Sequence, residues 1–183
     1  MSESPRRIVI AIATALGLAS AMAVQAAAEE PGVFEDRIVF GQSAAFEGPS
    51  AALGVDMRDG ILAAFNEANL DGGIDGRDLE LISYNDGYEP NRAIENTQRL
   101  LEQDEVFALI GEVGTPTSKA VQPLATEMGV PFIGPFTGAS FLRDPSLGNV
   151  VNVRASYKQE AEAWIRYLTE QLDLTRIAIL YQD

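Results

Sequence analysis

Hydroxyl-bearing side chains gather in two short turns near the middle of the sequence. The first turn, GEVGTPTS, covers residues 111–118, and the second, GPFTGAS, covers residues 134–140. Each turn follows an apolar segment typical of a buried strand. Hydroxyls and free backbone amides at the start of a helix are groups that bind anions. The two turns therefore indicate a site for a carboxylate or a similar anion, if the fold brings them together.

The first turn is expected to begin a helix. Thr115 suits the N-cap and Pro116 the first helical position, which would leave the amides of Thr117 and Ser118 without helical acceptors. The Thr115 and Thr117 hydroxyls would add hydrogen bonds to an anion. The same residues also fit a cap that serves only its own helix. The second turn, which follows the neighbouring strand, favours the binding interpretation.

The inventory of side chains excludes several kinds of chemistry. The chain contains no His and no Cys, so Ser–His and Cys–His catalysis and His-based metal sites are excluded. No G-x-G-x-x-G fingerprint follows the first strand, and Asp86 after the second strand is read as a turn residue. We therefore predict no enzyme activity, no cofactor and no metal. The formal net charge of −14 excludes nucleic acid and anionic membrane surfaces as partners.

Strand-like and helix-like segments alternate along the chain. The expected helices carry apolar residues on one face, including Ile61 and Phe65, Leu100 and Leu101, Val121 and Ala125, and Trp164 and Ile165. The alternation predicts an α/β fold with a doubly wound parallel sheet. Ligands bind such sheets beyond the carboxyl ends of the strands. The expected strands cover residues 37–42, 79–84, 106–111, 130–134, 150–154 and 176–182.

The first 28 residues are predicted to be a signal peptide. Arg6 and Arg7 precede an uncharged apolar run, residues 8–24, and small residues then offer cleavage after Ala26 or Ala28. An uncleaved membrane anchor is the alternative, because a run of about 18 apolar residues can span a bilayer. Cleavage would place the protein in the bacterial periplasm. Because the chain ends directly after an apolar strand, we expect it to be the N-terminal part of a longer protein.

Four phrases in order resemble the type I periplasmic solute-binding proteins of ABC importers, in their leucine/isoleucine/valine-binding branch. They are IVFGQSAAFEGPSAALG, FNEANLDGGIDGRDLELISYNDGYEPNRAIEN, ALIGEVGTPTSKAVQPLATEMGVPFIGP and RIAILYQD, and the resemblance covers residues 37–183. It implies two lobes joined by three crossovers that close on a small ligand. Residues 29–155 would form an incomplete lobe one and residues 156–183 the start of lobe two, with the first crossover near residues 154–157.

The resemblance also implies a ligand site. It assigns the α-carboxylate of the ligand to the hydroxyl of Thr115, with help from positions matching Phe136 and Gly138. The predicted ligand-binding residues are Thr115, Thr117, Phe136, Thr137, Gly138 and Tyr157.

The sequence departs from the family pattern at three positions. Many amino-acid binders have Thr where this chain has Gly138, although Thr137 is adjacent and could substitute. Leu53 stands where a ring packs on the ligand, and Tyr157 stands near the acid that pairs with the α-ammonium. Glu112 and Glu160 are the remaining candidate acids. The expected ligand is therefore an amino acid or a related carboxylate or amide.

The resemblance implies a protein that delivers its ligand to an ABC transporter permease and is monomeric at full length. The ligand-binding part of a sensor is an alternative, which predicts a transmembrane helix beyond Asp183. An exported enzyme is a third, which would need its nucleophile or metal site elsewhere. For residues 29–183 alone we expect poor solubility, because an incomplete sheet exposes an unpaired edge.

Overall fold

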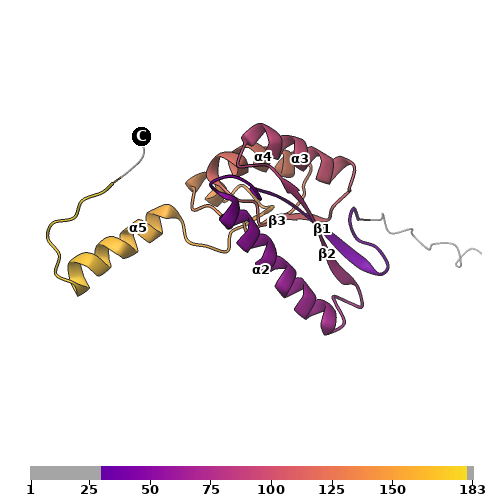
Figure 1. The fold of residues 1–183 in the computed structure, drawn as a ribbon, viewed down its shortest axis with the longest axis horizontal. Helices are drawn as coiled ribbons and strands as arrows, with labels where there is room; N and C mark the ends of the chain where they lie inside the picture. The colour runs from indigo at the N-terminus through magenta and orange to yellow at the C-terminus, as the bar shows by residue number, and fades with distance from the viewer. Residues whose placement is uncertain (1–29, 181–183) are drawn as a thin grey trace, which may run out of the picture.

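The computed structural model describes residues 30–180, and the predicted signal peptide lies outside them. Five parallel strands form one sheet in the order β2-β1-β3-β4-β5. Figure 1 shows helix α2 on one side of the sheet and helices α3 and α4 on the other. This confirms the predicted doubly wound α/β fold. The strands are β1 (Arg37–Ala44), β2 (Asp78–Asn85), β3 (Ala108–Ile110), β4 (Phe132–Ile133) and β5 (Val150–Val151).

The sheet is best developed at β1 and β2, which pair along their whole length from Arg37–Asp78 to Ala44–Asn85. The later strands are shorter than the apolar runs that predicted them. β5 ends at Val151 rather than at Arg154, because β4 supplies only two residues for it to pair with. The carboxyl ends of the short strands β3, β4 and β5 lie at the same end of the sheet, where the polar turns begin.

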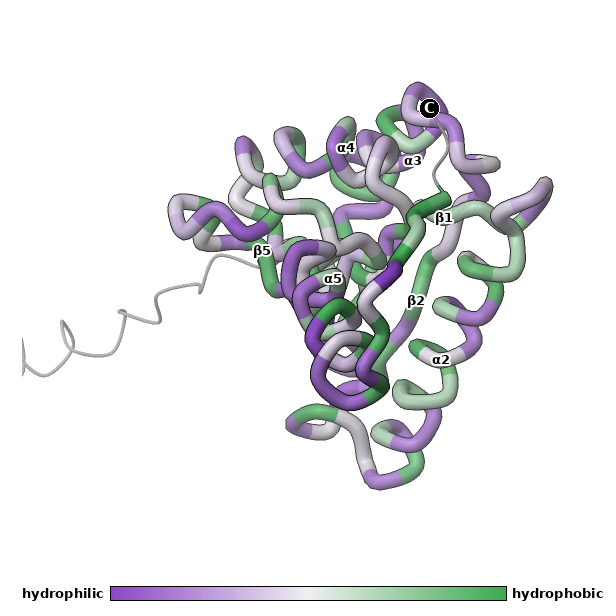
Figure 2. Tube along the Cα trace, turned by 90° about the vertical axis from the view of Figure 1, so that its left-hand side faces the viewer, coloured by the Kyte–Doolittle hydropathy of each residue, from purple (hydrophilic) through white to green (hydrophobic). Residues whose placement is uncertain are grey.

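The helices form where the apolar periodicity places them. They are α2 (Ala51–Leu70), α3 (Pro90–Glu102) and α4 (Thr115–Glu127). α3 begins at Pro90, a residue that suits the first turn of a helix, and α4 packs beside it. Figure 2 shows apolar and polar residues interspersed along α2 and α5. The core between sheet and helices includes Val39, Ala93, Leu100, Leu109, Val121, Ala125 and Phe132.

The segment after β5 differs from the prediction. Helix α5 (Tyr157–Arg166) forms and continues as a π-helical turn, η3 (Tyr167–Gln171), but its apolar face is not buried. Trp164 is 69% exposed, and Figure 1 shows α5 projecting away from the sheet. The strand predicted at 176–182 is wrong for residues 176–180, which form no strand. A strand needs a neighbour for its backbone hydrogen bonds, and no described segment lies beside this one.

The helices of residues 30–180 include none that is both long and apolar enough to cross a lipid bilayer.

Candidate functional site

The two polar turns lie side by side at the carboxyl ends of β3 and β4. Val113 and Phe136 form an isolated parallel bridge, and the Phe136 amide donates a 2.6 Å hydrogen bond to the Glu112 carbonyl. This bridge lies three residues beyond Ile110–Ile133, the last regular β3–β4 pair. The fold therefore brings together the two turns that the sequence analysis singled out.

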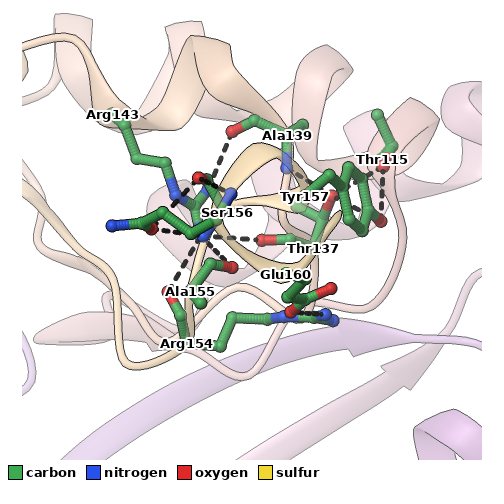
Figure 3. Close-up of polar contacts among 10 residues, drawn as sticks. Thr115, Thr137, Ala139, Arg143, Arg154, Ala155, Ser156, Tyr157 and Glu160 are labelled. Carbon is green, nitrogen blue, oxygen red and sulfur yellow. Dashed lines mark hydrogen bonds and ion pairs between the residues drawn. The ribbon is translucent and has the colours of Figure 1, made fainter. Parts of the chain in front are cut away.

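Three hydroxyl groups meet where the turns touch (Figure 3). The Oγ1 atoms of Thr115 and Thr137 lie 2.6 Å apart. The phenol oxygen of Tyr157 lies 3.2 Å from Thr137 Oγ1 and 3.4 Å from Thr115 Oγ1. Thr137 is fully buried, and its Oγ1 also accepts a hydrogen bond from the Ala139 amide. The three predicted residues Thr115, Thr137 and Tyr157 thus form one cluster, which we call the hydroxyl triad.

Helix α4 begins one residue earlier than predicted. Its N-cap is Gly114, with φ of 109°, a conformation that favours glycine, and Thr115 is the first helical residue. The prediction of Thr115 as N-cap and Pro116 as first helical residue was therefore wrong. The Ser118 amide donates to the Gly114 carbonyl, so it is not free. The amides of Thr115 and Thr117 remain without acceptors inside the helix.

The hydroxyl of Thr117 lies apart from the hydroxyl triad. It is buried and donates to the carbonyls of Val113 and Gly114, at 2.6 and 3.1 Å. These bonds hold the turn to the first turn of α4. The Thr117 backbone amide has no acceptor inside the helix.

Gly138 explains one of the three departures from the family pattern. A Cβ atom at this position would lie 2.5 Å from Tyr157 Cδ1 and 2.7 Å from the Tyr157 amide nitrogen. The Tyr157 amide donates a 2.8 Å hydrogen bond to the Gly138 carbonyl. A side chain at 138 would thus displace Tyr157, and the two residues depend on each other.

Phe136 and Leu53 belong to a neighbouring apolar groove rather than to the hydroxyl triad. Both line a groove of about 500 Å³ between α2 and the end of β3. Phe136 is half-exposed, and the Arg154 guanidinium lies 5.0 Å from the centre of its ring. The groove adds apolar surface beside the polar turns.

Hydrogen bonds perturb the ionisation of Tyr157. The Thr115 and Thr137 hydroxyls hold the pKa of the Tyr157 phenol below its usual value, and nearby Arg154 adds to this effect. The cause is that hydroxyl donors stabilise the phenolate oxygen more than the phenol. The hydroxyl triad is therefore suited to an anionic oxygen.

The two candidate acids do not face the hydroxyl triad. Glu160 forms an ion pair with Arg154. Glu112 is only 2% exposed: its Oε1 accepts a 3.4 Å bond from the Ser43 amide, and its Oε2 has no partner among the described residues. Burial raises the pKa of Glu112 well above its usual value, and the nearby Asp86 carboxylate raises it further.

Asp86 has the turn role predicted for it. Its carboxylate accepts hydrogen bonds from the Tyr88 amide at 2.7 Å and the Ser43 hydroxyl at 3.0 Å. Burial raises the pKa of Asp86, and these two bonds offset part of that rise. Within residues 30–180 no three His, Cys, Asp or Glu side chains are grouped so as to hold a metal ion.

Arg143 contributes to the site and was missed by the sequence analysis. Its guanidinium donates to four carbonyls, those of Thr137, Ala139, Arg154 and Ala155, at 2.7–3.2 Å (Figure 3). We call this set of bonds the Arg143 clasp. It ties the second polar turn to the segment that enters α5. Two of its partners lie 11 and 12 residues further along the chain, a spacing that matches no local motif, so no sequence signal could have identified it.

A pocket of about 570 Å³ opens between the second turn and the start of α5. Thr115, Gly138, Arg143, Tyr157 and Lys158 are among its lining residues, and the lining includes no acid. The arrangement offers hydrogen-bond donors and positive charge. This lining is compatible with the predicted anion site.

The chain is similar to several known proteins. Residues 37–183 match the family described as "Periplasmic binding protein". A crystal structure of a possible leucine/isoleucine/valine-binding protein from Rhodopirellula baltica is 45% identical, with a TM-score of 0.70, over 74% of this chain and 36% of that chain. LivJ from Streptococcus pneumoniae, solved with isoleucine, is 25% identical with a TM-score of 0.68 over 75% and 39% of the two chains.

Among curated proteins, the Leu/Ile/Val-binding protein BraC3 of Rhizobium johnstonii is 28% identical over 78% of this chain and 39% of its own length. The first curated relatives are matched over only 36–39% of their length. The matched relatives are substrate-binding proteins. The chain belongs to the periplasmic binding protein family, as an N-terminal part of a type I member of the Leu/Ile/Val-binding branch.

Proposed function

We propose that this chain is the N-terminal, ligand-capturing part of an extracytoplasmic solute-binding protein that delivers an amino-acid-like solute to an ABC transporter permease. The observation that carries the proposal is the hydroxyl triad at the carboxyl ends of neighbouring parallel strands. Relatives whose names specify leucine, isoleucine and valine, one of them solved with isoleucine, support a ligand of this class.

The carboxylate end of the solute would bind at the hydroxyl triad. Thr115 offers its hydroxyl, and the amides of Thr115 and Thr117 lie at the positive end of the α4 dipole. Thr137 supports Thr115, Gly138 admits Tyr157, and Phe136 supplies apolar surface beside them. This keeps all six predicted residues in the site, with Thr117 acting through its amide.

The α-ammonium end of an amino acid finds no partner among the described residues of the site. Glu112 points into the interior, and Glu160 is held by Arg154. The proposed ligand class therefore includes carboxylates and amides related to amino acids. The proposed activity is binding without bond chemistry, with no cofactor.

The remaining proposals concern the whole protein. We propose that residues 1–28 are a cleaved signal peptide and that the mature protein is periplasmic and monomeric. Residues 29–155 would form lobe one, and residues 156–183 would begin lobe two. The exposed apolar face of α5 agrees with this division, because a helix of lobe two would find its partners within that lobe.

Calorimetric titration of the full-length mature protein, stripped of ligand, tests the proposal. The panel contains amino acids, aromatic carboxylates and small amides. We expect Thr115→Ala to weaken the binding of the active solute about 10- to 100-fold, because it removes a hydrogen bond to a charged group. Thr169→Ala is the control, since the exposed Thr169 hydroxyl donates only to the Ile165 and Arg166 carbonyls of its own helix. Absence of binding across the panel, or unchanged binding by Thr115→Ala, would contradict the proposal.

A further inference from the structure

The phenol oxygen of Tyr157 occupies the position that a ligand oxygen would need. A carboxylate oxygen that accepts hydrogen bonds from both Thr115 and Thr137 must lie about 3 Å from each Oγ1 atom. The Tyr157 oxygen already lies 3.4 and 3.2 Å from these two atoms. Thr137 is fully buried, so a ligand oxygen from solvent would reach both hydroxyls on the side that Tyr157 covers, and the phenol would have to leave first.

The threonine hydroxyls are more enclosed by the protein than the phenol is. Thr137 is fully buried, and its Oγ1 accepts the Ala139 amide at 3.2 Å. Thr115 is the first residue of α4, so its backbone is held by the helix. Of the three residues, Tyr157 is the most exposed, at 49%, whereas Thr137 is fully buried.

The Tyr157 side chain can leave while its backbone stays. Its side chain borders solvent, with 49% of the residue exposed. Its amide is bound to the Gly138 carbonyl, and the Arg143 clasp holds the carbonyls of the two residues before Ser156. Rotation about the side-chain bonds would move the phenol towards solvent and leave this backbone in place.

We propose that Tyr157 is a gate on the carboxylate site: its hydroxyl fills the ligand-oxygen position in the free protein and swings out when a carboxylate binds. This inference rests on the proposed function. The lowered pKa of the Tyr157 phenol agrees with it, because the same donors would stabilise a carboxylate oxygen.

The gate has a thermodynamic consequence. Only molecules in which the Tyr157 ring has swung out can bind the ligand. The apparent dissociation constant of the ligand is therefore the intrinsic constant divided by the fraction of such molecules. Removing the hydroxyl removes the bonds that hold the ring in. Tyr157→Phe should therefore tighten binding, whereas the loss of a true ligand-contacting hydroxyl would weaken it.

The test is calorimetric titration of full-length mature protein, stripped of ligand, with L-leucine and with phenylacetate as probes. We expect Tyr157→Phe to bind the active probe about three- to tenfold tighter than the wild type, the ratio expected for losing about one competing hydrogen bond. Tyr167→Phe is the matched control, since Tyr167 is exposed in η3 and should leave the affinity unchanged. Circular dichroism verifies that both variants are folded.

The outcomes separate the gate from the proposed function. Equal or weaker binding by Tyr157→Phe, with a wild type that binds, overturns the gate and leaves the binding function intact. Binding by Tyr157→Phe alone supports both. If neither protein binds any solute of the wider panel, the proposed function fails and the gate fails with it.

Discussion

Residues 30–155 and residues 156–180 are built in opposite ways. The first region buries a continuous core between a sheet and its helices, whereas α5 and η3 have no buried residue. Both regions contain amphipathic helices with good sequence signals. The difference teaches that local signals suffice to form a helix such as α5, but burial and strand formation need a partner surface.

The capping of α5 shows how strong such local signals are. Ser156 and Gln159 form a reciprocal capping box, in which each side chain binds the backbone amide of the other residue. This helix therefore begins at a defined residue without tertiary support. The segment 176–180, which has strand-type residues and no cap, remains irregular.

The largest expected difference between the two regions is in stability. Phe132→Ala should lower the free energy of unfolding of the 183-residue chain by about 3–5 kcal/mol, because Phe132 is 1% exposed at the centre of the core. Trp164→Ala in α5 should lower it by at most about 0.5 kcal/mol. Urea unfolding followed by circular dichroism measures both, at a protein concentration low enough to avoid the aggregation expected of this chain. A Trp164→Ala effect as large as that of Phe132→Ala would show that α5 packs on the core.

A second difference concerns pH. The ordinary pKa of a Glu side chain is about 4.5, so the unfolded chain releases the Glu112 proton above about this pH. Because the pKa of Glu112 is raised in the folded protein, the folded protein keeps this proton to a higher pH. The stability from this group is complete below that pH and is lost as the pH rises through the raised folded pKa. A tenfold difference between the acid dissociation constants of the folded and unfolded states corresponds to about 1.4 kcal/mol of folding free energy lost at high pH.

Glu112→Gln should therefore make unfolding free energy less dependent on pH, and urea unfolding between about pH 4 and pH 9 would show it. Some dependence should remain, because the pKa of Asp86 is also raised. Glu162→Gln in α5 is the control, since Glu162 is exposed and its ion-pair partner is Lys158. An unchanged slope in Glu112→Gln would mean that Glu112 is not buried as described.

The smallest expected effect is in α5. Ser156→Ala removes the cap and should destabilise this helix locally by about 1 kcal/mol. Hydrogen exchange should speed up for α5 amides and stay unchanged for those of α3. Ser146→Ala is the control, because the Ser146 hydroxyl bonds only Asp144 in an exposed turn. Faster exchange in α3 would show that the two regions unfold together.

Much of the fold was predictable from local pattern. The predicted apolar face of α3, with Leu100 and Leu101, is buried. The errors concern strands whose length depends on pairing with a neighbouring strand. β5 is shorter than predicted, and the segment 176–180 forms no strand. The one-residue error at α4 arose because Gly114, rather than Thr115, adopts the cap conformation.

The candidate site was predictable in part. The residue types pointed to Thr115 and Thr137, since hydroxyls after neighbouring strands meet at one sheet edge. The Thr117 hydroxyl was expected to help bind the anion, yet its geometry directs it to its own turn. The Arg143 clasp could not be predicted from the sequence. Its acceptors are backbone carbonyls, and every residue has one, so no residue type marks these positions.

The α/β class, the helices and the two polar turns follow from local sequence pattern, because periodicity, caps and glycines act within a few residues. The tertiary structure alone decided that the oxygens of Thr115, Thr137 and Tyr157 meet within 3.4 Å. Such contacts depend on the β3–β4 register, on the close approach at Gly138 and on the Arg143 clasp. All three features join segments that are far apart in the sequence. Hydrogen bonds form only when the atoms are placed to within a fraction of an ångström, and only the tertiary structure provides that placement.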